Sequence, residues 1–194
     1  MKAILLAGAL SCMAVPAMAT PVNYTIDPDH TYPAFEADHM GGLSLWRGKF
    51  TKTTGAIVLD KEAKTGTINI TVDTTSLDFG HAKMSDHAKS DPAMFDVAKY
   101  PRATYKGTLT KFVDGKPTEV QGELTLRDVT KPVTLKINSF LCKPHPMRKK
   151  EVCGADAEAV INRGDFGITY GLGAPFNFKP DVKLLISVEA LADS

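Results

Sequence analysis

The side chains that could perform chemistry are few and widely spaced in this 194-residue chain. The five histidines are His30, His39, His81, His87 and His145. On one continuous strand, the nine-residue spacing of His30 and His39 would direct them to opposite faces. The six-residue spacing of His81 and His87 does not place them on one helical face. The spacing therefore predicts hydrogen-bonded structural histidines, and we predict neither a metal site nor catalytic residues.

Signatures of common enzymes are also missing from the sequence. It contains no G-x-S-x-G, H-E-x-x-H or C-x-x-C motif, and Gly41-Gly42 is too isolated to form a phosphate-binding loop. We therefore expect a protein that is not an enzyme. One enzymatic alternative stays open, in which His39 or His30 acts as a general base toward a bound small molecule.

Cys142 and Cys153 are predicted to form a disulfide bond. They flank the ten-residue loop KPHPMRKKEV, which lies between two runs of alternating polar and apolar residues. If these runs form a hairpin, the two sulfur atoms face each other, and closing the loop would stabilise the fold by about 3 kcal/mol. The alternatives are two reduced cysteines, or a metal site that also uses His145.

The same loop holds the densest basic cluster of the chain. Its members are Lys143, His145, Arg148, Lys149 and Lys150. At the mouth of a barrel, such a loop would form ion pairs with a phosphate or another anionic head group. Lys149 and Lys150 are the candidate head-group residues, and an ordinary solvated loop is the alternative.

The first nineteen residues have the pattern of a signal peptide. Met1-Lys2 supplies a positive start, the run 3–15 is apolar, and Ala17-Met18-Ala19 forms a small-x-small cleavage site. We therefore expect residues 1–19 to be a signal peptide and residues 20–194 to form one exported domain, where disulfides persist. A lipid anchor on Cys12 is an alternative, although the apolar run continues beyond this residue.

The charge balance argues against two classes of protein. The chain has 23 Lys and Arg residues and 22 Asp and Glu residues, and loss of Lys2 with the leader leaves 22 of each. Nucleic-acid binders and general membrane-surface binders need an excess of basic residues. We therefore expect no nucleic-acid partner.

Alternating apolar and polar residues predict an all-β fold. In GELTLRDVTKPVTL at 122–135, Leu124 and Leu126 would face one side of a sheet and Glu123 and Thr125 the other. Eight strands are predicted, at 22–38, 45–59, 67–73, 103–112, 118–126, 133–140, 154–162 and 182–191. A helical insertion is predicted after the third strand, with Asp91 as an N-cap. Such a chain predicts a sandwich or a closed barrel.

The aromatic residues are spread over these strands and the insertion. Those on the predicted strands, in the insertion and in the loops beside them include Phe35, Trp46, Phe50, Phe79, Phe95, Phe112, Phe140, Phe166, Phe176 and Phe178. An eight-stranded barrel is just wide enough either to be filled by side chains or to hold one slender ligand. The sequence leaves open whether the aromatic residues fill the interior or line a hollow one.

Six motifs, taken in order, resemble those of the YceI-like family. They are YTIDPDH at 24–30, FEADH at 35–39, GKF at 48–50, MFDVAKYP at 94–101, GELTLRDVTKPV at 122–133 and INRGDFG at 161–167. The resemblance extends over residues 22–191. It implies an exported, eight-stranded antiparallel lipocalin-like barrel with a short helical insertion after the third strand.

The resemblance also implies a function. Members of the family are associated with isoprenoid chains such as polyprenyl phosphates or quinones, so we expect a periplasmic binding or carrier protein for an isoprenoid lipid. The ligand-binding candidates carried over by position are Phe35, Ala37, His39, Phe50 and Phe95. Asn162, Arg163 and Asp165 are expected to hold a turn through hydrogen bonds.

The expected partner is an amphiphilic isoprenoid ligand. We expect no cofactor apart from a bound isoprenoid lipid or quinone. Membrane-associated quinone or cytochrome proteins stay open as partners, and the sequence leaves the oligomeric state undetermined. Two alternatives to a carrier remain: an enzyme that acts on a quinone or isoprenoid lipid, and a packed barrel with a stress-related or interaction role.

Overall fold

The computed structural model describes residues 20–193, so the predicted signal peptide at 1–19 lies outside the described residues. The strands are β1 (Val22–Ile26), β2 (Tyr32–His39), β3 (Ser44–Phe50), β4 (Thr53–Asp60), β5 (Thr65–Asp73), β6 (Leu77–Asp78), β7 (Arg102–Val113), β8 (Lys116–Leu126), β9 (Val129–Pro144), β10 (Glu151–Asn162) and β11 (Asp181–Ala192). The helical segments are η1 (Thr74–Ser76), α1 (Ala82–Ser90) and η2 (Arg163–Phe166). Within this part of the chain, no helix combines the length and hydrophobicity needed to cross a bilayer.

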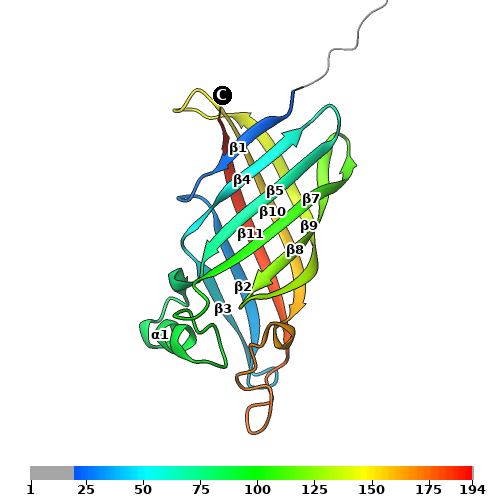
Figure 1. The fold of residues 1–194 in the computed structure, drawn as a ribbon. Helices are drawn as coiled ribbons and strands as arrows, with labels where there is room; N and C mark the ends of the chain where they lie inside the picture. The colour runs from blue at the N-terminus through cyan, green and yellow to red at the C-terminus, as the bar shows by residue number, and fades with distance from the viewer. Residues whose placement is uncertain (1–19, 194) are drawn as a thin grey trace, which may run out of the picture.

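The strands form one antiparallel sheet that closes on itself as a barrel (Figure 1). Its order is β1-β4-β5-β7-β8-β9-β10-β11, and pairing of β1 with β11 closes it. Three further strands extend this sheet beyond the closed barrel. Strand β2 pairs with β11, β3 pairs with β2, and β6 pairs with β3. The strands predicted at 22–38 and 45–59 are therefore each divided into two segments. The predicted eight-stranded antiparallel barrel is confirmed.

The turn that separates β1 from β2 is flanked by two buried polar residues, Asp27 and Thr31. Asp27 Oδ1 accepts the Asp29 N–H at 3.0 Å, and Asp27 Oδ2 lies 3.1 Å from His30 Nδ1. The Thr31 hydroxyl donates to the Glu189 carbonyl of β11 and accepts the Glu189 N–H, both at 3.1 Å. These side chains satisfy the backbone where Pro28 and the bend interrupt the strand ladder. The YTIDPDH motif thus shapes the barrel wall.

The helical insertion lies at one end of the barrel (Figure 1). Helix α1 begins after His81, whose Nδ1 accepts the Met84 N–H at 3.4 Å, and Asp91 is its C-cap. The prediction that Asp91 starts a helix is therefore wrong. The Asp91 Oδ1 atom accepts the Ala93 N–H at 2.7 Å, and this hydrogen bond closes a turn. Asp side chains commonly form such turns by binding the backbone two residues further along the chain.

Arg127, in the turn between β8 and β9, fastens this end together. Its guanidinium donates to the carbonyl oxygens of Pro92 and Gly167, each at 2.8 Å, and to that of Met94. It also lies over the Tyr100 ring, 5.0 Å from the centroid. The arginine of the GELTLRDVTKPV motif therefore holds the insertion and the loop after η2 against the barrel.

The hairpin predicted around the two cysteines is confirmed. Cys142 of β9 lies directly opposite Cys153 of β10, and the two are joined by a disulfide. The core lies inside the barrel, where Leu126 and its neighbour Leu124 turn inward as the alternation predicts.

Candidate functional site: the barrel interior

The barrel encloses an apolar cavity of about 430 Å³. Aliphatic and aromatic side chains from every strand of the closed barrel line it. This volume falls within the range of small-molecule sites in proteins. The interior is therefore hollow, and the alternative of a barrel filled by its own side chains does not hold.

The five ligand-binding candidates all line this cavity. They are Phe35, Ala37 and His39 on β2, Phe50 on β3, and Phe95 in the insertion. The Phe35 ring lies 6.1 Å from that of Phe50 and 6.0 Å from that of Phe95, and the last two rings are 5.6 Å apart. The structure thus brings together residues far apart in the sequence, and their contact with a ligand stays a prediction.

Two motif glycines make room for large side chains in the interior. A Cβ atom at Gly48 would lie 2.6 Å from Phe35 Cζ, and one at Gly122 would lie 2.7 Å from Tyr105 Cζ. The Tyr105 hydroxyl donates to the Val133 carbonyl at 2.9 Å, and burial raises the pKa of Tyr105 to about 12. Part of the family pattern therefore reflects aromatic rings that pack directly against strand backbone.

The cavity opens at the end of the barrel that carries α1. Its lining residues at this end are half-buried or exposed: His39, Trp46, Met84, His87, Tyr170, Phe176 and Phe178. The His39 ring stacks on Trp46 at 4.3 Å and lies 5.3 Å from Phe178. The Tyr170 ring lies 6.3 Å from Phe178 and 5.1 Å from His87. Aromatic rings therefore border the entrance.

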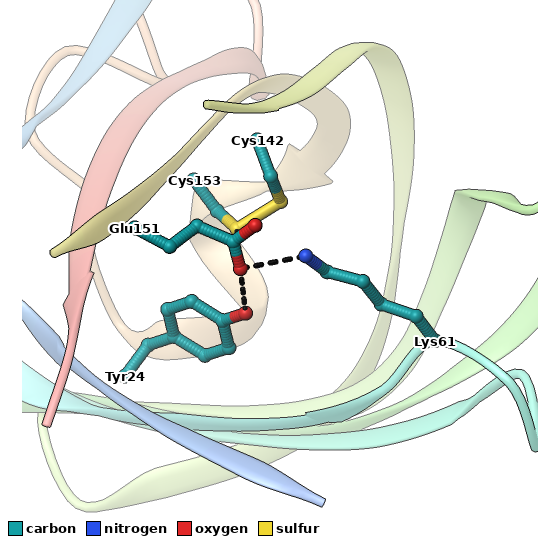
Figure 2. Close-up of a disulfide and its surroundings, with 5 residues drawn as sticks. All are labelled: Tyr24, Lys61, Cys142, Glu151 and Cys153. Atoms are coloured by element: carbon teal, nitrogen blue, oxygen red, sulfur yellow. Dashed lines mark hydrogen bonds and ion pairs between the residues drawn. A yellow bond between two sulfur atoms is a disulfide. The ribbon is translucent and has the colours of Figure 1, made fainter. Parts of the chain in front are cut away.

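The opposite end of the cavity is closed, and Figure 2 shows the residues that meet there. Lining residues at this end, such as Tyr24 and Leu59, are buried. The Tyr24 hydroxyl donates to the Glu151 carboxylate, which also accepts a hydrogen bond from Lys61 Nζ at 2.6 Å. This network lies beside the Cys142–Cys153 disulfide.

The closed-end network shifts the acidity of its members. Burial, together with the neighbouring Glu151, raises the pKa of Tyr24 above its ordinary value. Burial alone would raise the pKa of Glu151, but hydrogen bonds from Lys61 and Tyr24 outweigh it and hold this pKa below its ordinary value. Glu151 also lies close to both cysteine sulfurs, yet a disulfide offers no thiolate to a metal ion.

Lys149 and Lys150 lie at the closed end, in the turn between β9 and β10. Along β11, Val182 pairs with Ala37 near the entrance, and Ala190 pairs with Cys153 near the disulfide. The eight residue steps from Val182 to Ala190 span about 26 Å. The head-group role predicted for the two lysines therefore does not fit their position, because their loop is not at the mouth.

Of the three residues predicted to hold the loop after β10, Asn162 and Arg163 make the expected hydrogen bonds. Asn162 Oδ1 accepts the Gly164 N–H at 2.9 Å. The Arg163 guanidinium donates to the Ile168 carbonyl at 3.3 Å and to the Tyr170 carbonyl at 2.8 Å. Arg163 is also buried and lines the cavity, a second feature that the sequence pattern did not indicate.

Three of the five histidines lie in two different settings. His30 is on the outer side of the β1–β2 turn, where its partner Asp27 raises its pKa. His39 and His87 instead face the cavity entrance. Sequence reasoning missed His87 and Tyr170 as lining residues, because only the fold brings the insertion and the loop after β10 to one end of the barrel.

A closed eight-stranded antiparallel barrel with an apolar cavity open at one end defines a lipocalin-like barrel protein. Residues 24–190 match the family model of the YceI-like domain, and the chain belongs to the YceI-like family. Protein YceI of Escherichia coli O157:H7 is 35% identical over 176 residues, which cover 89% of this chain and 88% of that protein.

Solved structures share the same fold. The YceI protein of Campylobacter jejuni matches with a TM-score of 0.66 and 22% identity, covering 78% of this chain and 88% of that one. A polyisoprenoid binding domain from Saccharophagus degradans matches with a TM-score of 0.64 and 14% identity, covering 88% of this chain and 99% of that one. At these identities the likeness concerns the fold.

Proposed function

We propose that this protein binds an isoprenoid lipid inside its barrel and carries it through the periplasm. The observation that carries the proposal is the apolar cavity, which is closed at one end and bordered by aromatic rings at the other. The structural relative described as a polyisoprenoid binding domain has the same fold. Membership of the YceI-like family adds to this support.

The cavity walls suit an isoprenoid tail. Each methylene or methyl group that leaves water for such an interior contributes about 0.8 kcal/mol, so the tail needs few polar contacts. The aromatic rings of Phe35, Phe50 and Phe95 line the cavity, where they would pack against the tail. Because only one end is open, the tail enters first and the head group stays near His39 and Trp46.

The proposed periplasmic location rests on observations other than the cavity. The pattern at 1–19 is typical of a signal peptide, and the hairpin disulfide suits an oxidising compartment. No observation favours the alternative of a general base, since the contacts of His39 are aromatic and His30 lies outside the cavity. We therefore propose a binding protein and assign no reaction to it.

The proposal is tested by native mass spectrometry after purification without detergent. The protein is expected to retain a lipid, or to take up ubiquinone or a polyprenyl phosphate when these are added. Ala37→Trp fills the cavity and should lower uptake at least tenfold, whereas Ala56→Trp, on the exposed outer face of β4, should not change it. No lipid uptake by the wild-type protein, or equal uptake by both variants, would refute the proposal.

A further inference from the structure

Exposed apolar side chains gather at the open end of the barrel. Met40 and Leu43, in the turn between β2 and β3, are 48% and 74% exposed, and Leu45 at the start of β3 is 55% exposed. Phe176, in the loop after β10, is 41% exposed. Single exposed apolar residues are ordinary on a protein surface, but a group of them marks an interaction site. These four residues are called the apolar rim below.

The two segments of the apolar rim lie against each other. A Cβ atom at Gly41 would be 3.4 Å from the Asn177 carbonyl oxygen. The Lys179 N–H donates to Asp38 Oδ2 at 2.9 Å. Figure 1 shows the β2–β3 turn and the loop after β10 at the same end of the barrel as α1. The apolar rim is therefore one surface, built from segments that are distant in the sequence.

The apolar rim is continuous with the cavity lining. Phe176 belongs to both, because it is exposed and also lines the cavity. Its ring lies 5.5 Å from that of Phe178, which lies 5.3 Å from the His39 ring. The His39 ring in turn stacks on Trp46, the residue after Leu45 in β3. A lipid that leaves the cavity therefore meets exposed apolar side chains at the entrance.

The residue types at this end match the layers of a bilayer surface. Leu43 and Phe176 are exposed on the apolar rim, while the less exposed rings of Trp46 and Tyr170 line the entrance beside them. Tryptophan and tyrosine favour the head-group level of a membrane, and aliphatic side chains favour the acyl chains below it. A bilayer on this surface would also exchange lipid with the cavity, whereas a protein partner seated there would close the entrance.

The charged groups beside the β2–β3 turn balance each other. A Cβ atom at Gly42 would be 3.6 Å from Lys179 Nζ and 3.9 Å from Asp38 Oδ1. Docking through the apolar rim therefore depends on its apolar side chains. It does not need the excess of basic residues that a charge-driven membrane binder requires, and which this chain lacks.

We propose that the open end of the barrel docks on a phospholipid bilayer, with the apolar rim among the acyl chains and the cavity entrance facing the membrane. The inference rests on the proposed function, because docking gives a carried lipid a path between bilayer and cavity that avoids water. Insertion removes the apolar surface of the rim side chains from water, which favours docking. Because no ion pairing is involved, docking should change little with ionic strength.

The test uses vesicles of phosphatidylcholine, whose head groups have no net charge, and protein purified without detergent. Wild-type protein should float with the vesicles in a density gradient, at low and at high ionic strength. Trp46 is the one tryptophan of the chain, so its fluorescence reports on the entrance. Phosphatidylcholine with bromine atoms on its acyl chains should quench this fluorescence. Failure of the wild type to float, or flotation lost at high ionic strength, would overturn the inference.

A pair of double variants then locates the docking surface. Leu43→Gln/Leu45→Gln changes two rim residues outside the cavity lining described above, so it should lower partition onto the vesicles at least tenfold and abolish the quenching, with lipid uptake unchanged. Leu141→Gln/Met147→Gln is the matched control, because these residues are 60% and 83% exposed at the closed end. The control should partition like the wild type. Equal partition of the two variants would overturn the assignment.

Two further measurements separate docking from the proposed function and from self-association. Lipid uptake in native mass spectrometry without flotation would overturn docking and leave lipid binding intact. Flotation without any lipid uptake would support docking but refute the proposed function. Light scattering gives the oligomeric state. A wild-type dimer that Leu43→Gln/Leu45→Gln converts to a monomer would assign the apolar rim to a second copy of the chain and overturn docking.

Discussion

The two ends of the barrel are built from different interactions. At the closed end, a disulfide and the Tyr24–Glu151–Lys61 network join regular strands. At the open end, α1 and the loop after β10 are held by ring contacts and by arginine hydrogen bonds to backbone carbonyls. One end therefore carries covalent and ionic stabilisation, while the other carries the cavity entrance. Stability and binding are expected to respond to different substitutions.

The largest effect on stability is expected at Phe166, which anchors the open end. Its side chain is 2% exposed, within η2 and the core cluster. Phe166→Ala should lower the free energy of unfolding by about 3–5 kcal/mol, because it leaves a cavity in packed surroundings. Urea denaturation measures this loss. Phe176→Ala is the control, because it removes an exposed ring from the segment that follows η2. It should lower the free energy of unfolding by less than about 0.5 kcal/mol. Similar losses in both variants would contradict the anchoring role of Phe166.

The disulfide is expected to affect stability without affecting binding. The double variant Cys142→Ser/Cys153→Ser opens a loop with a sequence separation of 11 residues and should cost about 3 kcal/mol. Reduction of the wild-type protein should lower the melting temperature to a similar extent. Lipid uptake should stay unchanged, since the entrance is at the other end. Reduced uptake by this variant would show that the two ends are coupled.

The same contrast explains which features the sequence could predict. Strand alternation places Phe35, Ala37 and His39 on one face of a strand, because the two-residue period depends only on local geometry. The family resemblance is what assigned that face to the interior. The opposed cysteines of a hairpin follow from local geometry too. Neither argument says which end of the barrel a loop occupies, so sequence reasoning puts Lys149 and Lys150 at a barrel mouth and puts Arg163 only in a turn. That information lies in the pairing of β11 with β2 and β10, which joins residues distant in sequence.

The insertion shows a second limit of local reasoning. Asp before Pro is favourable both at a helix start and in a turn, so the pair Asp91-Pro92 does not decide between them. A residue outside the segment determines its conformation, because the Arg127 guanidinium donates hydrogen bonds to the carbonyl oxygens of Pro92 and Met94. These bonds hold the segment as a turn against the β8–β9 hairpin.

The smallest effect is expected for Tyr24→Phe, which removes one hydrogen bond from the closed end. The loss should be about 1.5–2 kcal/mol at neutral pH, because the acceptor is a charged carboxylate. Because the pKa of Glu151 is lowered in the folded protein, its stabilising contribution is present above its unfolded pKa of about 4.3 and is lost as the pH falls through the folded value. Tyr24→Phe brings the folded pKa of Glu151 closer to the unfolded one, so the variant should lose less stability in acid.

Above neutral pH, the stabilising contribution of Tyr24 depends on pH with the opposite sign. The pKa of Tyr24 is raised in the folded protein, so its contribution is present below its unfolded pKa of about 10 and is lost as the pH rises through the folded value. The stability difference between wild type and Tyr24→Phe should therefore be constant from about pH 5 to about pH 10 and shrink on both sides. Tyr105→Phe is the control. The Tyr105 hydroxyl donates to the Val133 carbonyl, which does not titrate. The stability difference between wild type and Tyr105→Phe should therefore shrink only in alkali. If wild type and Tyr24→Phe lose the same amount of stability as the pH falls, Tyr24 does not stabilise the Glu151 carboxylate.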